Sequence, residues 1–249
     1  MIILRIEKST PTDFISTSGL VDHMKLDRLR PGFLLYTGSR ALMISDGTTT
    51  HLIAGSLDGY REGVGAEARF WDITGFAQIS EKLVVVADWG NHCMRLIDRT
   101  TNNTSVLSGQ CGLRGGYKDG RPGQFSGPWS VVIDQKDKNQ LLITDDWNAA
   151  VRTVDVMSRA AGTFVKSDPL SRIIGITQEE KSGDLYVTAY NALYRITYIQ
   201  KTVSLISGSP GVLSNSRGYR DSSLLDSLFN YPEALIFIAP HILLIADTY

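Results

Sequence analysis

The sequence predicts an all-β protein built from repeated four-stranded antiparallel units. Three observations support this fold class: one segment recurs along the chain, a second element recurs upstream of it, and short strand-like runs alternate with turn residues. The runs are rich in Val, Ile, Leu, Thr and Tyr, and clusters of Gly, Asn and Asp separate them. No run of helical length with a 3.6-residue period is evident.

The recurring segment appears four times. Its clearest copies are residues 83–98 and 141–155, and in each copy an Asp is followed seven residues later by an Arg. Two weaker copies lie at 185–197 and 243–249. The residues that mark the repeat are Asp88, Arg95, Asp145, Arg152, Arg195 and Asp247.

The second element is an Asp–Gly or Asp–Ser pair that leads to an aromatic residue. It precedes the marker Asp of three copies by 30, 26 and 26 residues. Two separate elements that hold one register indicate a real repeat. The pairs begin at Asp58, Asp119 and Asp221, and the aromatic residues are Phe70, Phe125 and Phe229.

Each complete unit is expected to contain four short strands. The expected strands are 33–38, 41–46 and 50–54 in an early unit, then 74–79, 83–88, 92–98 and 104–108, then 129–134, 141–145, 150–155 and 160–165, then 172–177, 184–188, 192–197 and 201–206. Four strands in about 40–50 residues is typical of a β-propeller blade. One such sheet cannot bury both faces alone, so neighbouring units must stack.

The whole chain, residues 1–249, is expected to form one domain. Residues 1–55 would make a degenerate first blade, and 209–249 a partial last blade. Three blades would lie between them, at 56–109, 110–165 and 166–208.

The repeat resembles the NHL family. The resemblance rests on the Ala-Asp-x-x-Asn-His-x-x-Arg pattern that begins at Ala87, on the upstream Asp-Gly…Phe element, and on unit endings such as Leu107-Ser108-Gly109. It covers roughly residues 50–249 and is similar to extracellular or membrane-anchored animal members, whose propellers usually have six blades. The resemblance implies an incomplete six-bladed propeller with about 4–5 blades. We expect a truncated chain, because Tyr249 falls within a blade.

The repeated charged residues are interpreted as structural. Asp88, Asp145 and Asp247 are expected to accept backbone N–H groups in tight turns. In the NHL family the Arg bonds the backbone of a neighbouring blade, so the resemblance implies this role for Arg95, Arg152 and Arg195 rather than a catalytic one.

Two cysteines and two overlapping glycosylation patterns bear on the compartment. Cys93 and Cys111 are centred on a predicted hairpin turn at 98–103, a placement that favours a disulfide over two unrelated buried thiols. A disulfide implies an oxidising compartment. Asn102 and Asn103 each begin an N-x-[ST] acceptor pattern in the same turn. Together these features predict an extracellular or cell-surface protein.

Trp89 and Trp147 are the candidate interaction residues. Both follow the second strand of a unit, and large aromatic side chains dominate protein interfaces, although packing within the loops is the alternative role. The four histidines are scattered, so no metal ligand set is predicted, but ligands from different blades could still gather Ca²⁺ or Zn²⁺ on the axis. No cofactor motif is present.

The expected function is a non-catalytic scaffold whose loops on one face dock a protein or another ligand. The alternative is a propeller enzyme of the amidating-lyase or lactonase type with an axial metal. With 25 Lys and Arg against 26 Asp and Glu, no nucleic-acid partner is expected. No apolar run approaches the roughly 20 residues that span a bilayer, so no membrane span is expected.

Overall fold

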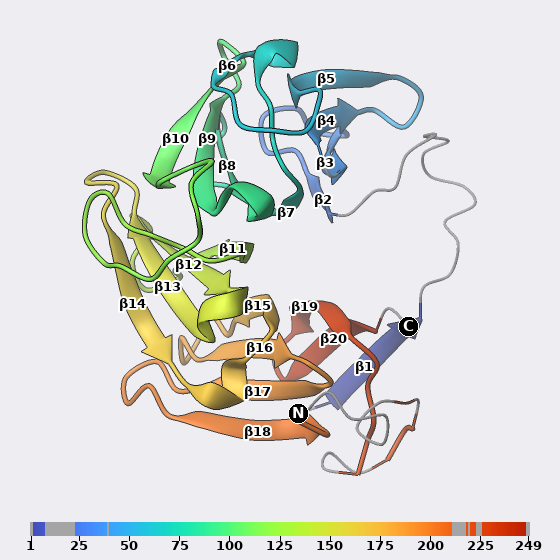
Figure 1. Ribbon diagram of the computed structural model, residues 1–249. Coiled ribbons are helices and arrows are strands. Elements are labelled where there is room, and N and C mark those ends of the chain that lie inside the picture. Colours follow the sequence, from blue (N-terminus) through green and yellow to red (C-terminus); the bar gives the residue numbers. More distant parts are fainter. Residues whose placement is uncertain are drawn as a thin grey trace.

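Short runs of β-favouring residues form five β-sheets that follow one another along the chain (Figure 1). The computed structural model describes residues 2–7, 23–38, 40–210, 218, 220–222 and 226–247, and these residues contain no α-helix. The protein is therefore all-β in the part of the chain described, and most of its sheets are four-stranded antiparallel meanders.

The sheets are numbered here from first to last in chain order, and their strands have the following bounds. The first sheet contains β2 (His23–Leu26), β3 (Leu34–Gly38), β4 (Ala41–Ser45) and β5 (Thr50–Gly55). The second contains β7 (Ile73–Gln78), β8 (Leu83–Asp88), β9 (Cys93–Asp98) and β10 (Asn103–Gly109), with β6 (Gly63–Val64) at its edge. The third contains β11 (Pro128–Ile133), β12 (Gln140–Asp145), β13 (Ala150–Asp155) and β14 (Ala161–Lys166). The fourth contains β15 (Ile173–Gln178), β16 (Leu185–Ala189), β17 (Ala192–Ile196) and β18 (Val203–Gly208). The last contains β19 (Pro232–Ala239), β20 (Ile242–Asp247) and β1 (Ile2–Glu7).

Every strand expected from the sequence is present, with ends that agree within two residues. The main differences lie at the two ends of the chain. Residues 23–26 add a strand, β2, that the pattern did not predict. Residues 2–7, which we expected in the first unit, pair in parallel with β20 in the last sheet. The second strand of that sheet would otherwise present an open hydrogen-bonding edge.

The core lies between successive sheets. Each of the four buried apolar clusters draws residues from two neighbours, as when Leu42 and Ile44 of the first sheet meet Phe76 and Val84 of the second. Figure 1 shows the five sheets around an arc, with the first strand of each sheet on the inner side. Stacking of this kind buries the faces that one sheet alone would leave exposed.

Glycines allow the inner strands to touch. A Cβ atom on Gly75 would lie 2.6 Å from the carbonyl oxygen of Trp129, and one on Gly175 would lie 2.6 Å from that of Glu233. Strands β7 and β15 therefore pack backbone to backbone against the first strand of the next sheet. This close packing brings the turns and connecting loops of neighbouring sheets together.

Candidate functional site

A buried Asp–Arg pair anchors the loop that enters the second sheet. Arg95 and Asp88 are fully buried, and Arg95 Nη1 donates to Asp88 Oδ2 at 3.1 Å. Arg95 Nη2 donates to the carbonyl oxygen of Arg61 at 2.9 Å, and its guanidinium lies between the rings of Tyr60 and Phe70 at 5.0 and 5.2 Å. The pair thus connects the sheet to its incoming loop.

The third sheet repeats this arrangement. Arg152 Nη1 donates to Asp145 Oδ2 at 3.0 Å, and both side chains are fully buried. The Arg152 guanidinium lies between the rings of Tyr117 and Phe125 at 4.6 and 5.0 Å. The aromatic residue that precedes each unit in the sequence therefore packs on the Arg of that unit.

An Asn completes each network, and sequence reasoning gave it no role. Asn91 Nδ2 donates to Asp88 Oδ2 at 2.9 Å and to the carbonyl oxygen of Gly59 at 2.8 Å. Asn148 donates in the same way to Asp145, at 2.8 Å. The signal was present in the sequence, because each Asn follows its Asp by three residues.

The two weaker copies of the repeat keep only part of the network. Asp247 Oδ1 accepts the backbone N–H of Asn230 at 2.8 Å, as Asp88 Oδ1 accepts that of Trp71. Arg195, in contrast, is 44% exposed and pairs with Asp184 of its own sheet. The strand register places Tyr194 opposite Val187, where Arg95 lies opposite Val86.

The reason for this shift is the length of the turn. Four residues separate β8 from β9, but only two separate β16 from β17. A sequence alignment that matches Arg195 to Arg95 is therefore displaced by one residue from the strand register, in which Tyr194 is the equivalent of Arg95. Side chains alternate between the two faces of a strand. Arg195 therefore lies on the other face from Tyr194, and it makes none of the loop contacts of Arg95 in the bonds described.

Cys93 and Cys111 form the predicted disulfide. Cys93 begins β9 opposite Gly109, the last residue of β10, and Cys111 follows two residues later. The bond therefore joins the sheet to the start of the connecting loop 110–127, not one strand to another. The other end of this loop carries Phe125 and Ser126, which contact the third sheet.

The two glycosylation candidates lie in the β9–β10 turn. Asn103 is exposed and begins β10, whereas Asn102 is half-buried and its carbonyl oxygen accepts the N–H of Gly65 at 2.9 Å. This turn lies at the opposite end of β9 from residues 89–92.

One end of the sheets, which we call the loop face, carries turns 89–92 and 146–149 together with loop 110–127. Three tryptophans and a histidine, here named the Trp cluster, meet on this face at the junction of the second and third sheets. Trp89 packs edge-on against Trp147 at 5.1 Å and against Trp129 at 6.0 Å, and His92 lies 5.4 Å from Trp147. The Trp147 side chain is 50% exposed, so the cluster presents an indole ring to solvent.

Titratable groups lie in and next to the Trp cluster. Burial raises the pKa of Asp146 to about 6, although Arg172 Nη1 lies 3.2 Å from its carboxylate. The indole of Trp89 lies beside the same carboxylate. His92 Nδ1 accepts the N–H of Gly127 at 3.1 Å, and burial lowers the pKa of this histidine. The neutral imidazole therefore carries its proton on Nε2.

The predicted interaction residues thus lie in direct contact. Trp147 is the exposed member, while Trp89 supports it from below. Trp71 is 57% exposed on the same face and lies over Gly90, where a Cβ atom would be 2.7 Å from Trp71 Cγ. The arrangement offers aromatic surface and hydrogen-bonding groups, which suits binding.

The opposite face carries polar clasps between sheets that sequence reasoning missed. In each clasp, an Asp just after the first strand of one sheet accepts a hydrogen bond from a Gln that ends the first strand of the next sheet. The donor–acceptor distance is 3.2 Å for Gln78 and Asp27, and 3.0 Å for Gln178 and Asp134. A third side chain, beyond the third strand of that next sheet, also donates to the Asp. The clasps are Asp27 with Gln78 and Arg99, and Asp134 with Gln178 and Tyr198.

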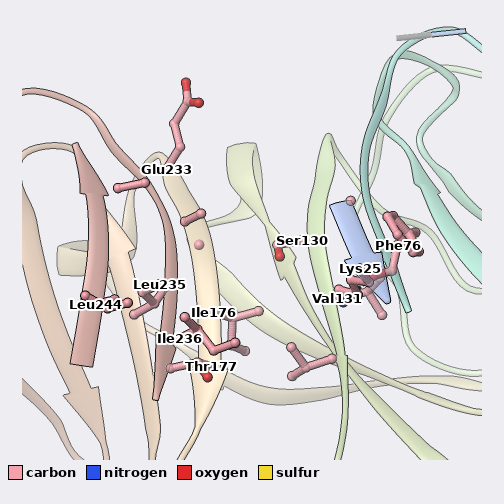
Figure 2. Close-up of a pocket in the computed structure, with 15 residues that line it drawn as sticks. Lys25, Phe76, Ser130, Val131, Ile176, Thr177, Glu233, Leu235, Ile236 and Leu244 are labelled. Carbon is pink, nitrogen blue, oxygen red and sulfur yellow. Dashed lines mark hydrogen bonds between the residues drawn. The ribbon is translucent and has the colours of Figure 1, made fainter. Parts of the chain in front are cut away.

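A cavity of about 380 Å³ lies among the inner strands of the five sheets (Figure 2). Its walls are mostly apolar, and in Figure 2 Ile176 and Ile236 lie between Lys25 on one side and Leu244 on the other. Glu233 follows the first residue of β19, at the loop-face end, whereas Lys25 is in β2 near the other end of the inner strands.

No group of three or more His, Cys, Asp or Glu side chains is placed to hold a metal ion among the described residues. No helix in the described part of the chain is long and apolar enough to cross a membrane.

Solved structures share this fold at low sequence identity. An auxiliary nutrient binding protein from Bacteroides ovatus matches 86% of this chain with a TM-score of 0.62 and 14% identity, over 47% of its own length. The extracellular domain of a proposed hybrid two-component system from B. thetaiotaomicron matches 90% of this chain, with a TM-score of 0.56 and 15% identity, over 25% of its length.

A third similar structure is virginiamycin B lyase from Staphylococcus aureus, a β-propeller. It matches 89% of this chain with a TM-score of 0.55 and 14% identity, over 61% of its length. This chain thus spans less than two thirds of the length of each of these proteins. No family model and no curated protein matches the sequence. The protein has an all-β fold whose structural neighbours include β-propellers and extracellular binding or sensor domains.

Proposed function

We propose that this chain is a non-catalytic binding scaffold whose loop face docks a protein partner. In this proposal its sheets are the blades of an NHL-type β-propeller. The observation that carries the proposal is the Trp cluster, which presents the half-exposed indole of Trp147 on a rigid base formed by Trp89. Exposed aromatic residues supported by packing are typical of interface hot spots.

The buried Asp–Arg pairs explain why this surface is preorganised. Arg95 and Arg152 hold the connecting loops against their sheets, and Asp88 and Asp145 bind the backbone beside Trp71 and Ser126. A surface held in its binding shape loses little conformational entropy on association. Rigid loops on a β scaffold are therefore suited to recognition.

We further propose an extracellular location. Disulfides persist in oxidising compartments, and Cys93 and Cys111 are paired. The exposed Asn103 of the β9–β10 turn is the better glycan acceptor of the two candidates, and its place at the far end of β9 would leave the loop face uncovered.

A binding screen tests the docking proposal. Purified wild-type protein would be screened against a set of secreted and ectodomain proteins by surface plasmon resonance, together with Trp147→Ala and Met157→Ala variants. Met157 is a matched control, because it is 79% exposed and lies in the turn at the other end of β13. Loss of a hot-spot residue costs about 2 kcal/mol or more, which is about a 30-fold loss of affinity.

We expect at least one partner whose affinity falls by about this factor with Trp147→Ala and is unchanged with Met157→Ala. The proposal would be contradicted if every partner kept its affinity for Trp147→Ala, or if affinity depended on Met157 instead. A screen in which no partner binds would also contradict it.

A further inference from the structure

The cavity among the inner strands has a basic group at one end and an acidic group at the other, and it lies apart from the Trp cluster. At one end, the Nζ of Lys25 donates to the carbonyl oxygen of Phe76 at 2.6 Å and lies 5.2 Å from the ring of that residue. Lys25 retains an exposed surface, and the bond to Phe76 is the one hydrogen bond of its ammonium among the described residues, which leaves donor capacity for a ligand. Arg28, two residues after the end of β2, adds a second positive charge nearby.

The acidic residue of the cavity lining, Glu233, lies at the other end. Glu233 lies at the loop-face end of β19, and in Figure 2 its carboxylate points away from Lys25 and the other labelled side chains. Between the two ends most of the described wall is apolar, with the partly exposed Val132 from the third sheet and with Ile236 and Leu244 from the last. Ser130 and Thr177 are its polar members. The Ile236 side chain is 59% exposed, so part of this apolar surface lacks a protein neighbour.

We propose that this cavity binds a small amphiphilic carboxylate, with its anionic head on Lys25 and its hydrocarbon body along Val132, Ile236 and Leu244. Its volume of about 380 Å³ falls within the range of small-ligand pockets, about 300–1,000 Å³. An anion gives the Lys25 ammonium a charged partner, which none of the described ion pairs supplies in this largely apolar wall. An apolar body covers the surface that Ile236 leaves open to water.

The ionisation of Lys25 supports the proposal. Burial, with a smaller effect of Arg28, lowers the pKa of Lys25 to about 8. A bound carboxylate favours the charged amine, so binding must weaken as the pH rises above about 8 and the free amine loses its proton. This site is independent of the Trp cluster, and the two proposals can fail separately.

Isothermal titration with decanoate tests the site. Decanoate is expected to bind with one-to-one stoichiometry, and Lys25→Met is expected to weaken it about tenfold or more, because a charge-assisted hydrogen bond is lost. Decanol, which has the same chain and no charge, should bind wild type and Lys25→Met equally. Lys25→Arg should retain decanoate, and Lys82→Met, which alters an exposed lysine outside the cavity, should have no effect.

A second measurement needs no variant. The affinity of wild-type protein for decanoate should fall between pH 7 and pH 9, while that for decanol stays constant. Absence of saturable decanoate binding, equal affinity in Lys25→Met, or a pH profile shared by decanol would overturn the proposal.

Discussion

At the residue scale, the buried Arg side chains show why one amino-acid type has two roles in this chain. Arg95 is fully buried, and its donors reach Asp88 and backbone carbonyls of the incoming loop. Arg195 is 44% exposed and makes one ion pair on the surface of its own sheet. Arg195 lies one residue beyond the register position of Arg95, on the other face of its strand, and the resulting difference in burial separates an architectural arginine from an ordinary surface pair.

This difference predicts unequal losses of stability. Arg95→Met leaves the Asp88 carboxylate buried without its cation, which typically costs about 3–5 kcal/mol. Arg195→Met removes an exposed pair, which typically costs about 1 kcal/mol or less. Urea unfolding of the two variants measures both values, and similar losses would show that the two arginines are equivalent.

Asp146 adds a pH dependence beside the Trp cluster. Burial raises its pKa from 3.8 to about 6, so the folded state favours the protonated carboxyl. The stability that this group contributes is complete at low pH and is lost as the pH rises from 3.8 to about 6. Because Trp89 lies beside the carboxylate, tryptophan fluorescence should change with a midpoint near pH 6.

Variants identify the titrating group. Asp146→Asn is expected to abolish the fluorescence transition, and His92→Gln to keep it. The histidine variant is the control because burial lowers the pKa of His92 from its ordinary value and this side chain also belongs to the Trp cluster. A transition that survives in Asp146→Asn and disappears in His92→Gln would assign it to the histidine.

At the scale of elements, strand positions followed directly from the sequence, but one register did not. Short apolar runs between clusters of turn residues located β7 to β18 within two residues, because each strand buries side chains against a neighbouring sheet. The position of Arg195 depended on the length of the β16–β17 turn, which a repeat alignment does not measure. Strand β2 was not predicted, because four residues are too few to show a periodic pattern of apolar side chains.

The disulfide acts on a single loop, which gives an element-scale prediction. Cys93→Ala with Cys111→Ala should reduce the free energy of unfolding by about 3 kcal/mol. It should also expose loop 110–127 to trypsin, with faster cleavage after the exposed Arg114 and Lys118. Mass spectrometry of the fragments identifies the sites.

The control is Lys138, which is exposed in the turn between β11 and β12. Its cleavage rate should change much less than that of Arg114 and Lys118. Equal acceleration at all three sites would mean that the bond stabilises the whole fold and does not hold this loop in particular.

At the scale of the whole molecule, the candidate site arises only when two sheets meet. The sequence identified Trp89 and Trp147 as candidates because both follow the second strand of a unit, but their contact depends on the packing of the second sheet on the third. The Asp–Gln clasps and the cavity likewise use residues from different sheets. Such sites could not be predicted from the sequence, since their members are 40 or more residues apart.

The most direct test of the binding face is hydrogen–deuterium exchange of the protein alone and in complex with a partner recovered by the screen. The account predicts slower exchange in turns 89–92 and 146–149 and in loop 110–127, with no change in turns 99–102 and 156–160 at the opposite end of the sheets. Protection confined to the opposite turns would contradict the claim that the loop face is the docking surface.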